Sequence, residues 1–139
     1  MHVDAGKLGT IPLFEGLSRK ELRELSSVTD EVVLAEGTQL IDEGAFSYEF
    51  LLMTSGTAEV RRGGSLVATL GPGDFAGEVG AMRDARRNAS IVATSEITAI
   101  VITARDLRRI AELMPSVAEQ LEAAIATRSG EGSIGPGSS

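Results

Sequence analysis

The middle of the chain is a succession of short apolar or alternating runs separated by glycine-containing turns. Between about Glu31 and Ile102 these turns come at intervals of roughly ten residues. Runs such as "YEFLLMTSG" and "ASIVATSEITAIVIT" are rich in residues that favour strands. Turn signals at this spacing are typical of an antiparallel sandwich or barrel. We therefore expect a mainly β core.

Helical periodicity appears at the two ends of this β region. Ser18 and Glu21 have the spacing of a capping box, and leucines follow them at helical intervals. After the strands, Thr103 is the expected N-cap of a second helix, and Pro115 is the expected start of a third. The predicted fold class is mainly β with flanking helices: a double-stranded β-helix (jelly-roll) barrel with an N-terminal helical segment and two C-terminal helices.

The length of the chain fits one domain with its own core. It has 139 residues, of which 42% are hydrophobic. We expect a single domain over residues 1–128. Residues 129–139, "SGEGSIGPGSS", have almost nothing apolar to bury, and we expect them to form a disordered Gly/Ser-rich tail.

Composition and charge count against several functions. The net charge is −7 and neither end carries a basic block, which is unlike a nucleic-acid-binding protein. The sequence shows no signal peptide and no 18-residue apolar segment, so we expect a cytoplasmic protein with no membrane partner.

Catalytic chemistry also finds little support. The chain has no cysteine, and its one histidine, His2, lies near the terminus with no partner suggested by the sequence. A cupin-type metal enzyme, the competing interpretation, needs several inward histidines. No acid–base or nucleophile set is apparent, and we expect a protein that is not an enzyme, with no catalytic and no metal-binding residues.

One segment of the β region departs from the strand pattern: "LGPGDFAGEVGAMRDARRNASIVATS". Pro72 between two glycines predicts a turn, and residues 77–82 can form a single helical turn. The free backbone N–H groups of such a turn suit a phosphate. Glu78 could accept a hydrogen bond from a ribose 2′-OH, and the guanidinium of Arg87 could bind two phosphate oxygens. Together these residues indicate a binding site for a small nucleotide.

Other interpretations of the same residues stay open. Glu78 alone could be a helix-start residue or a solvated acid, and Arg87 alone could be a surface cation. The two side chains could also pair directly in an empty pocket.

The segments together resemble the cyclic nucleotide-binding domain family, which the catabolite activator protein shares with the regulatory subunits of cAMP-dependent protein kinase. "IPLFEGLSRKELRELSSV" resembles the opening helical segment of that family. "EGTQLIDEGAFSYEFLLMTSGTAEV" resembles its first barrel strands. "GDFAGEVGAM" followed by "RRNAS" resembles its phosphate-binding cassette.

The resemblance implies a role for each cassette residue. Glu78 would bond the ribose 2′-OH, Arg87 would pair with the cyclic phosphate, and Ala89 would be small because the ring lies against it. Backbone N–H groups of the cassette would complete the phosphate cradle, chiefly those of Gly80 and Asn88. The full set of expected ligand-binding residues is Gly77, Glu78, Val79, Gly80, Arg87, Asn88 and Ala89.

The function that this resemblance implies is a regulatory sensor domain for a cyclic nucleotide. The favoured ligand is cAMP, with cGMP as the alternative, and the two C-terminal helices would signal occupancy to an effector domain or protein. The competing interpretation is a degenerate cyclic nucleotide-binding fold that acts only as a docking or dimerisation module. The oligomeric state stays open.

Overall fold

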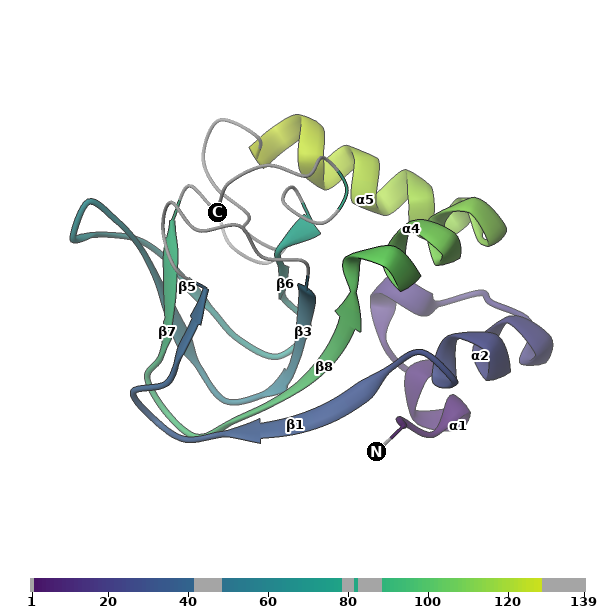
Figure 1. Cartoon of the computed structure of the whole chain (residues 1–139), viewed down its shortest axis with the longest axis horizontal. Helices are drawn as coiled ribbons and strands as arrows, with labels where there is room; N and C mark the ends of the chain where they lie inside the picture. Colours follow the sequence, from purple (N-terminus) through teal and green to yellow (C-terminus); the bar gives the residue numbers. More distant parts are fainter. Residues whose placement is uncertain (1, 42–48, 79–81, 83–88, 129–139) are drawn as a thin grey trace.

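The computed structural model describes residues 2–41, 49–78, 82 and 89–128 (Figure 1). Its strands are β1 (Asp30–Leu34), β2 (Gln39–Ile41), β3 (Glu49–Ser55), β4 (Ala58–Arg62), β5 (Ser65–Leu70), β6 (Phe75–Ala76), β7 (Ser90–Ala93) and β8 (Ile97–Thr103). They form two four-stranded antiparallel sheets, ordered β1-β8-β3-β6 and β2-β7-β4-β5. This arrangement confirms the predicted jelly-roll class.

Helices gather at one end of the sheets (Figure 1). They are α1 (Ala5–Leu8), the 3-10 turn η1 (Pro12–Phe14), α2 (Arg19–Ser26), α4 (Ala104–Leu113) and α5 (Pro115–Arg128). The backbone N–H of Glu21 donates to Ser18 Oγ at 3.1 Å, and the Glu21 carboxylate accepts from the Ser18 N–H at 2.9 Å. Thr103 Oγ1 accepts from the backbone N–H of Asp106 at 3.2 Å. The predicted capping box and the Thr103 N-cap are therefore confirmed.

The sheet β1-β8-β3-β6 separates two sets of buried side chains. Successive residues of a strand point to opposite faces. In β3, Phe50 and Leu52 therefore pack toward the helices, while Leu51 and Met53 point into the barrel. Phe50 also contacts Phe75 of β6, with ring centroids 5.4 Å apart.

We call these two sets the helical core and the barrel core. The helical core consists of Val3, Leu8, Ile11, Leu13, Phe14, Leu25, Phe50, Leu52, Phe75, Ile100, Ile102, Ala104, Leu107, Ile110, Met114, Val117, Leu121 and Ala124. The barrel core consists of Ile41, Leu51, Met53, Ala58, Val60, Leu70, Ala76, Ala89, Ile91, Ala93, Ile97 and Ala99.

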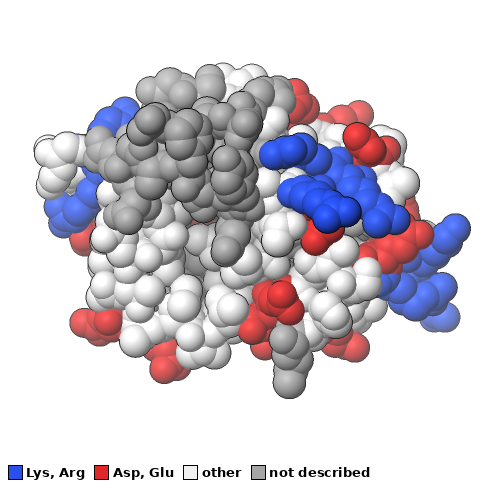
Figure 2. All heavy atoms as spheres, viewed as in Figure 1, with Lys and Arg blue, Asp and Glu red and all other residues white. Residues whose placement is uncertain are grey.

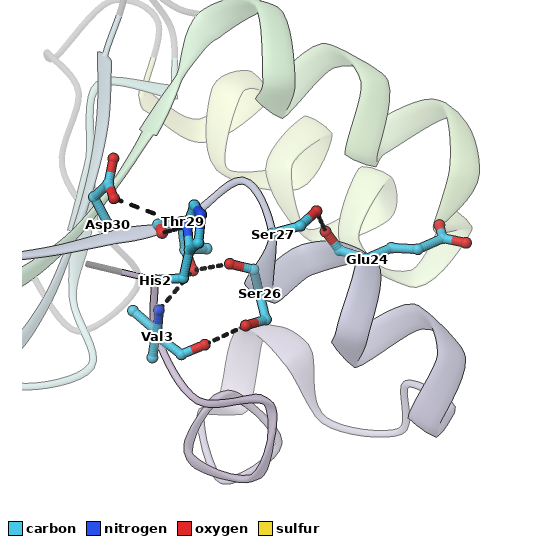
Figure 3. Close-up of polar contacts among 7 residues, drawn as sticks. All are labelled: His2, Val3, Glu24, Ser26, Ser27, Thr29 and Asp30. Atoms are coloured by element: carbon cyan, nitrogen blue, oxygen red, sulfur yellow. Dashed lines mark hydrogen bonds and ion pairs between the residues drawn. The ribbon is translucent and has the colours of Figure 1, made fainter.

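Polar contacts tie the N-terminal residues to the end of α2 (Figure 3). His2 Nδ1 donates to the Thr29 carbonyl oxygen at 2.9 Å and lies 3.9 Å from Asp30 Oδ1. The Val3 N–H donates to Thr29 Oγ1 at 3.3 Å, and Ser26 Oγ donates to the Val3 carbonyl oxygen. The sequence suggested no partner for His2, and the structure places its partner, Thr29, 27 positions away along the chain.

Candidate functional site

The approach to the candidate site is a tight hydrogen-bonded turn before β6. The Gly71 N–H donates to the Asp74 carboxylate at 2.8 Å, and the Asp74 N–H donates to the Gly71 carbonyl oxygen at 3.1 Å. Met53 of β3 bonds to both sides of the turn, accepting from the Gly73 N–H at 2.8 Å and donating to the Asp74 carbonyl oxygen at 2.9 Å. The turn predicted around Pro72 is confirmed, and these bonds fix where β6 begins.

Sequence reasoning missed the part that Asp74 plays in this turn. Its side chain is buried and caps a backbone N–H three positions earlier. An aspartate that closes a glycine- and proline-containing turn is a recognised local signal, and it could have been used here.

The backbone changes direction directly after β6. Gly77 has a φ of +94°, in the left-handed region that favours glycine. The next residue, Glu78, is helical, and so is Met82 four positions later. Glu78 and Met82 agree with the turn predicted over residues 77–82, whereas Gly77, with its positive φ, lies before the helical residues.

Glu78 is fully buried, with 0% of its surface exposed. Its burial rules out the interpretation of Glu78 as a solvated acid. Taking a carboxylate out of water is costly unless hydrogen bonds or charges compensate it, and Glu78 does take part in an interaction within the chain. Two carboxylate oxygens can accept several hydrogen bonds, so a ligand hydroxyl could share this group.

The chain on both sides of the predicted cassette faces the inside of the barrel. Ala76, which precedes Gly77, belongs to the barrel core and is in register with Leu51 of β3. Ala89, at the other end of the cassette, belongs to the same core and is 4% exposed. The two described ends of the cassette therefore both pack into the barrel core.

A cavity of about 380 Å³ lies between β1 and β2, and no described residue of the cassette belongs to its lining. Leu51 and Ile41 of the barrel core form part of its lining. Asp30, Thr38 and Gln39 add polar groups. Its size and mixed lining are those of a site for a small molecule with both apolar and polar parts.

Four of the expected binding residues lie outside the described residues: Val79, Gly80, Arg87 and Asn88. The phosphate-binding half of the cassette therefore stays a prediction. The expected tail, 129–139, also lies outside the described residues.

Two other kinds of site find no support within the described ranges. No group of three or more histidine and carboxylate side chains there could hold a metal ion. No helix in the described part of the chain is long and apolar enough to cross a membrane.

Comparison with known proteins gives a family match over residues 31–113, more than half of the chain, to the model described as the cyclic nucleotide-binding domain. Among individual relatives, the cAMP-dependent protein kinase regulatory subunit of Yarrowia lipolytica is 35% identical over 94 residues. That match covers 66% of this chain and 25% of that protein. The chain spans about a quarter of the length of the curated relatives of this kind.

Solved structures agree with this match. The catabolite activator protein of Thermus thermophilus superposes with a TM-score of 0.74 at 29% identity, covering 86% of this chain and 59% of that one. The regulatory subunit of a cAMP-independent protein kinase A from Trypanosoma brucei has a TM-score of 0.77 at 20% identity, covering 89% of this chain and 46% of that one, and shares the fold. The resemblance read from the sequence is thereby confirmed, and the chain belongs to the cyclic nucleotide-binding domain family.

Proposed function

We propose that the chain is a non-enzymatic, cytoplasmic sensor domain, spanning residues 1–128, that binds cAMP. The observation that carries this proposal is the fully buried Glu78, directly after the left-handed Gly77 at the wall of the barrel. In that position the carboxylate accepts a hydrogen bond from the ribose 2′-OH. Such a bond is strong because the acceptor is charged and water is excluded.

The cassette residues that follow hold the phosphate. Arg87 pairs with the cyclic phosphate through its guanidinium, and the backbone N–H groups of Val79, Gly80 and Asn88 complete the cradle. This local cluster of donors attracts an anion despite the net charge of −7. Ala89 leaves room for the ring, because a larger side chain at this buried position would fill the barrel interior.

The choice of ligand and of function rests on the relatives. The name of the Yarrowia lipolytica protein supports cAMP, and cGMP is the alternative ligand. The competing function is a domain that has kept the fold of its family and serves only for docking or dimerisation.

Occupancy is signalled through the C-terminal helices. Met82 lies four positions after Glu78 and packs against the helical core, which includes Leu107 of α4 and Leu121 of α5. Gln120 of α5 also donates to the Leu13 carbonyl oxygen of η1 at 3.0 Å. A ligand that repositions the Glu78 turn therefore changes the packing of Met82 against the helical core to which these helices belong, and the resulting difference in contacts shifts their equilibrium position.

Calorimetric titration of nucleotide-free protein with cAMP, cGMP and linear 5′-AMP tests the proposal. We expect saturable binding of cAMP near one per chain and weak binding of 5′-AMP. Arg87→Ala should weaken binding by about 2–5 kcal/mol, roughly 30-fold to 5,000-fold. The adjacent Arg86→Ala is the matched control and should bind as the parent does. Unchanged affinity of Arg87→Ala would reject the phosphate assignment, and absence of binding to any nucleotide would favour the docking function.

The role of Glu78 is tested with 2′-deoxy-cAMP, which lacks the hydroxyl. The parent chain should bind this analogue about 1.5–3 kcal/mol more weakly than cAMP, roughly 10-fold to 150-fold. In Glu78→Gln that preference should shrink, because the charged acceptor is gone. Equal affinity of the parent chain for the two nucleotides would contradict the ribose contact, whether or not the variant folds.

A further inference from the structure

Exposed cations gather on two helices at the helical end of the molecule. Figure 2 shows lysine and arginine on this side, with aspartate and glutamate among them. We call six exposed cations the basic patch: Arg19, Lys20 and Arg23 of α2, and Arg105, Arg108 and Arg109 of α4. They are nearly half of the 13 Lys and Arg residues in the chain.

Two of the four acids in α2 and α4, Glu21 and Asp106, are directed toward the helix starts. The Glu21 carboxylate accepts the Ser18 N–H at 2.9 Å, and the Asp106 carboxylate accepts from Thr103 Oγ1 at 3.1 Å. Glu21, Glu24 and Asp106 are half-buried, whereas Glu112 and the cations of the patch are exposed. Apart from Arg108, no cation of the patch forms an ion pair in the described part of the chain.

One stripe of α4 combines charge with an exposed apolar side chain. Arg105, Arg109 and Leu113 are spaced four residues apart, so they follow one another along the same side of the helix. Leu113 is 49% exposed, while Leu107 and Ile110 on the other side of α4 are buried in the helical core. The stripe therefore offers two guanidinium groups and one apolar contact in a row.

We propose that the basic patch docks an acidic segment of an effector protein, one that carries carboxylates and at least one apolar side chain. Arginine guanidinium groups bind carboxylates through two parallel hydrogen bonds, and Leu113 supplies an apolar anchor. This surface is additional to the nucleotide site and does not depend on it.

A peptide fits the patch better than a membrane or a nucleic acid does. A flat anionic bilayer or a long polyanion would also approach the remainder of a chain whose net charge is −7, and that remainder would repel it. A narrow peptide can contact the stripe of α4 alone.

Fluorescence anisotropy of the whole chain with a labelled peptide of about twelve Asp, Glu and Leu residues tests the proposal. We expect saturable binding that weakens as salt is raised. Arg109→Glu should lower the affinity roughly threefold to tenfold at low salt. The control is Arg61→Glu, which changes the net charge equally but lies in β4, where Arg61 pairs with Glu59 at 2.8 Å. Leu113→Ala should also weaken binding.

Several outcomes would overturn the proposal. One is the absence of saturable peptide binding, and another is an equal loss in Arg109→Glu and Arg61→Glu, which would show a mere effect of net charge. Tighter binding to duplex DNA, or to phosphatidylcholine vesicles with about 30% phosphatidylserine, would assign the patch to another partner. Thermal melting of each variant checks that it is folded, and Arg109 is exposed, so its replacement should leave the melting temperature unchanged.

Discussion

Replacing Gly56 by alanine should destabilise the fold strongly, because two separate costs meet at this residue. Gly56 lies between β3 and β4 with a φ of +90°. Forcing a residue with a β carbon into this region costs about 1–2 kcal/mol. The added β carbon would also lie 2.3 Å from the Glu96 carbonyl oxygen and 3.0 Å from Ile97 Cα, so the backbone would have to move. Overpacking of this kind costs about 1–3 kcal/mol.

Together these costs predict a loss of about 2–5 kcal/mol in the free energy of unfolding for Gly56→Ala. Gly37→Ala is the matched control, because Gly37 has a φ of +89° but no heavy atom lies within 4 Å of the position of an added β carbon. The control should lose only the conformational part, about 1–2 kcal/mol.

Urea denaturation of both variants and the parent, followed by circular dichroism, measures the difference. The overlap with the Glu96 carbonyl should make Gly56→Ala clearly the less stable variant. Equal losses in the two variants would refute the reasoning, since they would show that the strand ends at Gly56 relax freely.

Three further changes address the helices and the surface. Ser18→Ala should lower the free energy of unfolding by about 1 kcal/mol, because it removes the capping box of α2, and an unchanged melting temperature would contradict this. Leu107→Ala should lower the free energy of unfolding, measured by urea denaturation, by about 2–5 kcal/mol, because Leu107 is buried. Leu113→Ala, at the exposed end of the same helix, should change it by about 0.5 kcal/mol or less. Similar losses in the two variants would disprove the buried role of Leu107. Lys7→Ala removes the surface ion pair with Glu31 and should cost less than about 1 kcal/mol, and a loss that does not shrink as salt is raised would argue against this.

The features that the sequence predicted well are those with local signals. The starts of α2 and α4 follow from side chains that cap backbone groups three positions away. The strand-like run "YEFLLMTSG" is found as β3, whose pleat then places Phe50, Leu51 and Leu52 on alternating faces. The turn before β6 follows from Pro72 and its flanking glycines.

The features that the sequence could not predict depend on distant partners. His2 has no local cue for its bond to the Thr29 carbonyl, because only the folded chain brings these residues together. The full burial of Glu78 likewise depends on how the barrel closes around β6, and a glutamate after a glycine is usually exposed. At the candidate site, the family motif pointed to Glu78, and only the structure shows that this residue is buried.

The sheet shared by the helical core and the barrel core has a consequence for folding. If the N-terminal segment, α4 and α5 detach together in a sub-global opening, the barrel can keep its own interior while Phe50, Ile100 and Ile102 become exposed to water. Amide protons of β8, which pairs with both β1 and β3, should then exchange more slowly with solvent than those of α5. Such an opened species would present a contiguous apolar sheet face, and its lifetime would set how readily the protein aggregates.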